Sequence, residues 1–118
     1  MPVEKVVVIG SGVMGSGIAA HCANAGCEVL LLDIVLEGKE DRNYLSNSAI
    51  SKIQKSNPEM LMHKSYINRI STGNIEDDIT KISDADWVIE VIVEDLELKK
   101  ELYSKIAEHM GPETIISS

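Results

Sequence analysis

The chain has 118 residues, of which 19 are Asp or Glu and 11 are Lys or Arg, so its formal net charge is −8. This length allows one domain at most. Hydrophobic residues make up 44% of the chain, which is enough to form a core. The acidic balance argues against nucleic-acid binding, which relies on clustered Lys and Arg, and no apolar run approaches the roughly 20 residues of a membrane-spanning helix.

The first third of the chain has the pattern of one βαβ unit. The β-branched residues of Lys5–Ile9 predict a strand that is buried on both faces. Apolar residues then recur at helical spacing, and Gly26 lies where a left-handed C-cap would end this helix. The apolar run 28–32, closed by Asp33, predicts a second strand. Strand, glycine-rich turn, helix and strand fit into about 30 residues, the size of such a unit.

The next segment, 35–69, is long for a connection between strands and is therefore expected to be structured. Apolar residues between Leu45 and Ile53 mark one face of a helix, and Pro58 ends it. Residues 59–64 form a second short helix in this interpretation. We expect a helical hairpin, inserted between the second and third strands.

The rest of the chain continues the alternation. It predicts a short strand within 66–72, a helix beginning at 74–78, a buried strand at 87–93, an amphipathic helix around Leu102 and a last strand at 114–117. The fold class is α/β, with a Rossmann-type, doubly wound parallel sheet. Because only five strands are predicted, we expect the domain, residues 1–118, to be incomplete at its C-terminus. An uncovered apolar sheet edge would then favour self-association.

The glycine motif Gly10-x-Gly12-x-x-Gly15 stands between the first predicted strand and helix. In this context, Gly10 permits a tight turn, Gly12 lets a pyrophosphate approach the backbone, and Gly15 allows close packing of helix and strand. The free N–H groups and the positive dipole end of the helix would bind the phosphates. The motif therefore predicts a dinucleotide site.

Asp33 closes the second strand, 18 residues beyond Gly15. Its carboxylate could accept hydrogen bonds from both ribose hydroxyls of an adenosine and would repel a 2′-phosphate, and Ile34 supplies no guanidinium to compensate. NAD is therefore favoured over NADP. Flavin proteins use the same fingerprint, so FAD stays open as a lesser alternative.

Two stretches resemble a known family. Residues 10–19 read Gly-Ser-Gly-Val-Met-Gly-Ser-Gly-Ile-Ala, and residues 87–96 read Trp-Val-Ile-Glu-Val-Ile-Val-Glu-Asp-Leu, with Lys99 following. Together with Asp33 and the helical insertion, they are similar to the amino-terminal domain of NAD-dependent L-3-hydroxyacyl-CoA dehydrogenases of fatty-acid β-oxidation. The similarity covers nearly the whole chain and looks closest to the long bacterial multifunctional forms.

The resemblance implies two sets of binding residues. The cofactor set comprises Gly10, Gly12, Val13, Met14, Gly15, Asp33, Ile34, Val91, Ile92, Glu94 and Lys99. In the family the insertion contacts coenzyme A, and the candidates here are Ser48, Ser51, Lys52 and Lys55. A solvated helix face is the alternative for this second set.

The resemblance also implies what these 118 residues do not hold. In the family, Asn-Thr-Ser follows the two serines that end this sequence, and that Ser acts with a His–Glu pair and a later Asn. We therefore expect no catalytic residue here, NAD(H) binding without turnover, and 3-hydroxyacyl-CoA binding only with a further C-terminal part. The alternatives are a non-catalytic nucleotide-binding module and a fragment of a 3-hydroxyisobutyrate-type dehydrogenase, whose shorter linker between strands argues against it.

The histidines and cysteines indicate whether a metal site is expected and in which cellular compartment the protein lies. His21, His63 and His109 stand at no metal-ligand spacing, so we expect no metal site. Cys22 and Cys27 match neither a Cys-x-x-Cys pair nor a zinc pattern, which favours reduced thiols. We expect a cytoplasmic protein.

Overall fold

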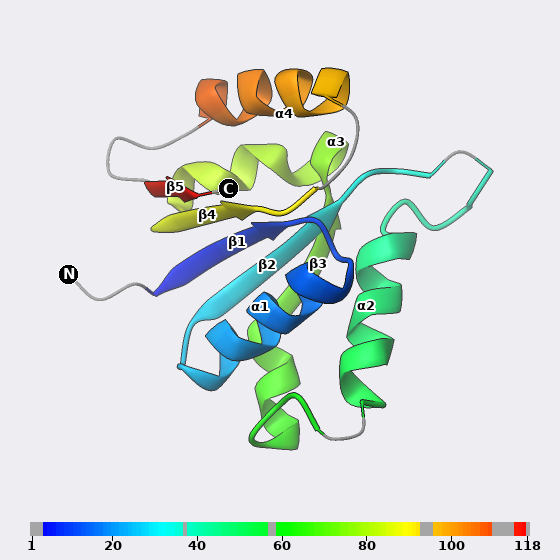
Figure 1. Ribbon diagram of the computed structural model, residues 1–118, viewed down its shortest axis with the longest axis vertical. Helices are drawn as coiled ribbons and strands as arrows, with labels where there is room; N and C mark the ends of the chain where they lie inside the picture. Colours follow the sequence, from blue (N-terminus) through cyan, green and yellow to red (C-terminus); the bar gives the residue numbers. More distant parts are fainter. Residues whose placement is uncertain (1–3, 37, 57–58, 93–95, 110–114, 118) are drawn as a thin grey trace.

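The computed structural model describes residues 4–36, 38–56, 59–92, 96–109 and 115–117 (Figure 1). Within those ranges, no helix combines the length and the apolar character needed to cross a membrane. The elements in chain order are β1 (Lys5–Ile9), α1 (Val13–Asn24), β2 (Glu28–Asp33), α2 (Tyr44–Gln54), the 3-10 helix η1 (Lys64–Arg69), β3 (Ile70–Asn74), α3 (Ile75–Asp78), the 3-10 helix η2 (Ile79–Asp84), β4 (Trp87–Glu90), α4 (Leu96–His109) and β5 (Ile115–Ser117).

The five strands form one parallel sheet in the order β3-β2-β1-β4-β5. β1 lies at the centre, where Val7 pairs in register with Leu30 of β2 and with Val88 of β4. The chain leaves β1 toward β2 and later returns to its other side with β4. This reversal makes the sheet doubly wound, as predicted. Such sheets usually bind ligands at the carboxyl ends of the strands where the order reverses, here β1 and β4.

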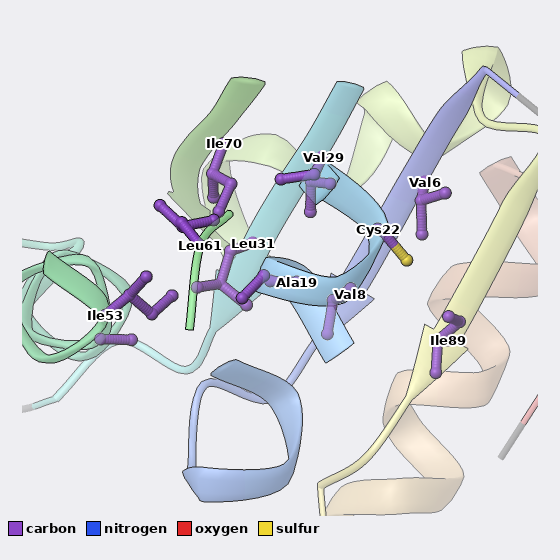
Figure 2. Close-up of a cluster of buried hydrophobic side chains, with 13 residues drawn as sticks. Val6, Val8, Ala19, Cys22, Val29, Leu31, Ile53, Leu61, Ile70 and Ile89 are labelled. Carbon is purple, nitrogen blue, oxygen red and sulfur yellow. The ribbon is translucent and has the colours of Figure 1, made fainter. Parts of the chain in front are cut away.

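Helices cover both faces of the sheet (Figure 1), and alternate residues of β1 serve the two faces. Val6 and Val8 belong to the cluster beneath α1 and α2, which Figure 2 shows. Val7 and Ile9 belong to the cluster beneath α3, η2 and α4. Every apolar position of β1 after Lys5 is therefore buried, which explains the uninterrupted β-branched run in its sequence.

The predicted insertion is partly confirmed and partly wrong. Helix α2 forms as expected, with Ala49 and Ile53 buried on its inner face. No helix covers residues 59–63, all of which the structure describes. The second helical element is instead η1, a 3-10 helix, and β3 spans Ile70–Asn74, so it starts within the predicted range 66–72 and runs beyond it.

Asn24 of α1 explains the missing helix. Its side-chain amide donates a hydrogen bond to the carbonyl oxygen of Met60 over 3.0 Å, and its oxygen accepts one from the N–H of Met62 over 2.8 Å. These backbone groups are thus satisfied across the structure rather than within a helix. The segment packs as an extended bend against the end of α1.

The later strands are confirmed with shorter bounds. β4 ends at Glu90, whereas the prediction ran to 93, and β5 begins at Ile115. The last predicted position of the former and the first of the latter lie outside the described residues. Ile115 of the edge strand β5 is 61% exposed, and self-association through this edge stays a prediction.

Candidate functional site

In the turn between β1 and α1, Gly10 and Gly15 stand at positions that disfavour a side chain. Gly10 has a φ of +112°, and its N–H donates to the carbonyl oxygen of Leu32 over 2.8 Å. A Cβ atom on Gly15 would overlap the carbonyl oxygen of Gly10 and lie 2.8 Å from its carbonyl carbon. The first turn of α1 therefore packs directly on the end of β1, as the motif predicts.

Gly12 lies at the N-cap of α1 and faces open space. A Cβ atom there would meet no other atom within 4 Å, and no side chain caps the helix. The next two side chains turn outward, since Val13 is 95% and Met14 66% exposed. The first N–H groups of a helix have no partner within it, so this end of α1 can bind an anion.

Asp33 lies beside this turn. Its Oδ2 accepts hydrogen bonds from the N–H of Ser11 over 2.8 Å and from the hydroxyl of Ser11 over 2.5 Å. Its Oδ1 accepts one from the N–H of Ile34 over 2.7 Å. The sequence predicted a carboxylate at this point but not that the glycine turn would bind it.

Val91 and Ile92, which directly follow β4, border the same turn. The N–H of Val91 donates to the carbonyl oxygen of Ile9 over 2.9 Å. A Cβ atom on Gly10 would lie 3.1 Å from both the carbonyl carbon of Val91 and the nitrogen of Ile92. Ile34 packs at the edge of the cluster beneath α4. The structure thus brings the glycine turn, the end of β2 and the end of β4 together.

The structure describes the other predicted cofactor residues only in part, and it places the predicted coenzyme A residues on one helix. Glu94 lies outside the described residues. Lys99 belongs to α4, but its side chain is outside the description. The coenzyme A candidates all lie on α2 or at its C-cap; Ser48 is half-buried, whereas Ser51, Lys52 and Lys55 are exposed.

An apolar groove of about 500 Å³ extends from the glycine turn along α1. Val13 and Met14 line it at the turn, and Trp87 and Ile89 line it from β4. A second cavity, of about 580 Å³, lies at the opposite, amino ends of β1 and β2. The groove along α1, and not the larger cavity, adjoins the predicted cofactor residues.

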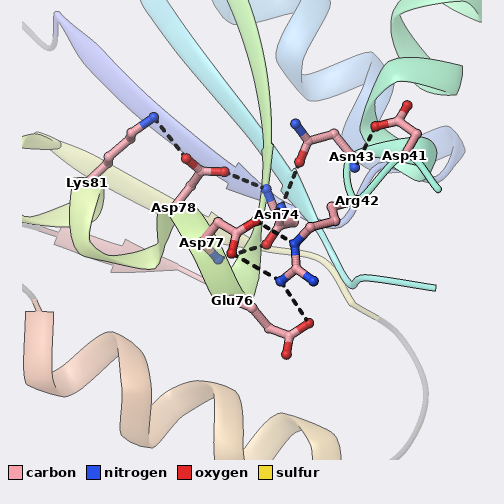
Figure 3. Close-up of polar contacts among 8 residues, drawn as sticks. All are labelled: Asp41, Arg42, Asn43, Asn74, Glu76, Asp77, Asp78 and Lys81. Carbon is pink, nitrogen blue, oxygen red and sulfur yellow. Dashed lines mark hydrogen bonds and ion pairs between the residues drawn. The ribbon is translucent and has the colours of Figure 1, made fainter. Parts of the chain in front are cut away.

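A polar network that the sequence analysis missed fixes the chain between β2 and α2 (Figure 3). Arg42 donates to both carboxylate oxygens of Asp77, over 2.7 and 3.0 Å. The buried side chain of Asn74 donates to Asn43 over 2.8 Å and to Asp77 over 2.9 Å. Its oxygen accepts the N–H of Asp77, so Asn74 also caps α3. An Asn before three acids is a recognisable N-cap signal.

This network changes the ionisation of its members. The hydrogen bonds from Arg42, and secondarily that from Asn74, lower the pKa of Asp77 below its ordinary value. The same pairing raises the pKa of Arg42. No three His, Cys, Asp or Glu side chains gather as a metal site would require anywhere in the part of the chain that the structure describes.

Known proteins resemble the chain in both sequence and structure. Residues 5–118 match the family model of the 3-hydroxyacyl-CoA dehydrogenase NAD-binding domain. A protein of Deinococcus radiodurans, named a probable 3-hydroxyacyl-CoA dehydrogenase, is 46% identical over 118 residues, which are all of this chain and 34% of that protein. A Rickettsia felis protein, provisionally named a fatty acid oxidation complex trifunctional enzyme, is 47% identical over 98% of this chain and 16% of its own length.

The structural comparison agrees. The crystal structure of Escherichia coli 3-hydroxybutyryl-CoA dehydrogenase superimposes with a TM-score of 0.76 and 34% identity, over 98% of this chain and 24% of that one. A diketoreductase superimposes with a TM-score of 0.77 at 27% identity, over 98% of this chain and 41% of that one. The chain thus spans a minor part of each relative's length. NAD is the cofactor of the matched domain, and the resemblance seen in the sequence is confirmed. The chain belongs to the 3-hydroxyacyl-CoA dehydrogenase family and corresponds to that family's NAD-binding domain.

Proposed function

We propose that this chain binds NAD at the carboxyl ends of β1, β2 and β4, and that it forms the cofactor half of an enzyme oxidising L-3-hydroxyacyl-CoA to 3-oxoacyl-CoA. One observation carries the site assignment. The N-terminus of α1 is uncapped and faces open space at Gly12, and the Asp33 carboxylate lies beside the same turn. An anion-binding helix end next to a ribose-binding acid is what a dinucleotide requires.

Each part of the site has a separate role in this proposal. The first N–H groups of α1 bind the pyrophosphate, and the open space at Gly12 admits it to the backbone. Asp33 accepts a hydrogen bond from the adenosine ribose. Val91 and Ile92 border the cofactor, with Glu94 and Lys99 at its nicotinamide half. When bound, NAD supplies the acceptor for the substrate's hydride.

In this proposal, the catalytic residues belong to the part of the longer family members that has no counterpart in these 118 residues. The chain covers 34% of the Deinococcus relative, so the reaction of the whole protein is an inference from the family. We expect the 118 residues to bind NADH, to show no turnover, and to bind 3-hydroxyacyl-CoA only together with the remaining part. Rapid reduction of acetoacetyl-CoA by the purified chain would contradict this. We further propose a cytoplasmic location, consistent with Cys22 and Cys27 as thiols, and fractionation of the source cell would test it.

A matched pair of glycine variants tests the cofactor site. Gly12→Ala places a methyl group where the pyrophosphate would approach, and it should weaken NADH binding about tenfold or more. Gly17→Ala adds the same methyl group to the same helix, where its nearest neighbour would be Met60 Cε at 3.9 Å. It should leave the affinity unchanged. NADH fluorescence titration measures both. An unmodified chain that does not bind NADH, or a Gly12→Ala variant that binds it normally, would overturn the proposal.

The exposed face of α2 is proposed to contact coenzyme A. Ser48, Ser51, Lys52 and Lys55 recur at helical spacing, and the two lysines offer exposed charges to phosphate groups. Coenzyme A titrated into the NADH-bound chain should shift the backbone amide signals of α2 in an NMR spectrum. Shifts confined to other elements would show that the face is only solvated.

A further inference from the structure

Ser11 uses two donors to bind one oxygen of Asp33. Its N–H and its hydroxyl both donate to Oδ2, over 2.8 and 2.5 Å, while the N–H of Ile34 donates to Oδ1 over 2.7 Å. A carboxylate offers about four lone-pair positions. Three are therefore taken by the protein itself, and the position left for a ligand is on Oδ1. Asp33 meets a ribose through one oxygen rather than through both.

Ser11 is itself held from its other side. The hydroxyl of Ser16, in α1, donates to the carbonyl oxygen of Ser11 over 3.0 Å. Ser11 is 9% and Ser16 6% exposed, so water competes little for these bonds. The Ser16 bond holds only the Ser11 backbone. The Ser11 hydroxyl is held by the Asp33 carboxylate itself, and this pair fixes the rotation of the Asp33 side chain before any ligand arrives.

We propose that Ser11 is a positioning residue that makes this site select NAD over NADP. It prevents the Asp33 carboxylate from swinging aside to admit a 2′-phosphate, and it keeps Oδ1 available to a ribose hydroxyl. This inference rests on the proposed function, in which Asp33 lies against the adenosine ribose. A short charge-assisted hydrogen bond is strong enough for such a role.

The ratio of NADPH to NADH dissociation constants is the informative measurement, because both cofactors share the pyrophosphate and differ at the ribose. Ser11→Ala should weaken NADH binding roughly two- to tenfold, as expected for one lost hydrogen bond, and should lower the ratio by a similar factor. Ser11→Cys, which keeps the side chain's shape but donates weakly, should act likewise. Ser11→Thr keeps the hydroxyl and should retain the ratio.

Ser16→Ala is the matched control. It removes a buried hydroxyl from the same turn without touching Asp33, so any loss should be equal for NADH and NADPH and the ratio should persist. If Ser11→Ala and Ser11→Cys likewise weaken both cofactors in parallel, Ser11 only supports the turn and the inference is wrong.

Asp33→Ala separates this inference from the proposed function. If Asp33→Ala leaves the ratio unchanged, the ribose site itself is misplaced. If Asp33→Ala lowers the ratio but the Ser11 variants do not, only the role of Ser11 is rejected. In the Asp33→Ala background, Ser11→Ala should cause no further change in the ratio, because the two residues act as a unit.

Discussion

The α carbon of Gly15 faces the carbonyl group of Gly10 so closely that a side chain on Gly15 would lie 2.8 Å from the carbonyl carbon and overlap the oxygen. The obstacle is backbone, and it cannot rotate away as a side chain could. This contact presses the first turn of α1 onto the end of β1, where the cofactor's phosphates are proposed to bind.

Gly15→Ala should therefore damage the fold rather than the affinity alone. We expect the free energy of unfolding to fall by about 3 kcal/mol, the upper range for overpacking, as measured by urea denaturation. Gly17→Ala, in the same helix, should be neutral or slightly stabilising, because alanine favours a helix interior by about 0.5–1 kcal/mol. Equal stability of the two variants would contradict the packing described here.

Asp33→Asn tests the carboxylate with little change in shape. The amide keeps one oxygen for Ser11 but loses the charge, so NADH binding should weaken by about 1–3 kcal/mol. Fluorescence titration gives the affinity, and thermal unfolding of the same sample shows whether the variant is folded. A folded variant with unchanged affinity would remove Asp33 from the ribose site.

Acid should destabilise the protein through Asp77 and Asp86. Hydrogen bonds from the N–H groups of Lys5 and Glu4, in that order, lower the pKa of Asp86, and Arg42 lowers that of Asp77. A carboxyl whose pKa is lower in the folded state than its unfolded value of about 3.9 stabilises the fold above that value. This stability should be lost as the pH falls below about 4.

Urea denaturation at several pH values between 7 and 3 measures the effect. Asp86→Asn should be less stable than the unmodified chain at neutral pH and should lose less stability on acidification. Ser83→Ala, an exposed change that removes no titrating group, should keep the original slope. If Asp86→Asn keeps that slope too, the carboxyl of Asp86 does not contribute to the pH dependence.

Asn74→Ala should loosen the junction of β3, α3 and the segment before α2. It removes the N-cap of α3 and leaves polar groups of Asn43 and Asp77 without the Asn74 amide. A loss of about 1–3 kcal/mol in the free energy of unfolding is expected, measured in urea. Ser83→Ala is the control. It removes only the exposed hydrogen bond from the Ser83 hydroxyl to the Thr80 carbonyl and should change the free energy of unfolding by less than about 0.5 kcal/mol.

The sequence predicted the structure best where an element is determined by residues close to it in the chain. The run Lys5–Ile9, the glycine turn and the acid at Asp33 have patterns that specify strand, turn and ligand chemistry within about 30 residues. The segment 59–69 was misjudged because its structure depends on partners far along the chain. Asn24 binds the backbone of Met60 and Met62, and propensity alone cannot reveal such contacts.

The candidate site shows the same contrast between features set by neighbouring residues and features set by contacts between distant residues. The positions of the glycines could be predicted because each has a steric task in a known turn. The bond between Ser11 and Asp33 could not, because it depends on how the turn and the end of β2 meet in space. That Asp33 accepts hydrogen bonds from both ribose hydroxyls of an adenosine stays a prediction.

Helix α1 has two ends with different attachments. At its last turn, Asn24 binds the segment before η1, and the Arg69 side chain donates to the Ala23 carbonyl over 2.6 Å. At its N-terminus the helix has no side-chain cap. Twelve residues of helix span about 18 Å, which exceeds the distance over which mutational effects usually interact. Ser11 and Asp33, to which cofactor preference is proposed to belong, lie at the end opposite this anchor. Substitutions there should leave the scaffold in place, so the domain is a suitable starting point for engineering an NADP-dependent variant.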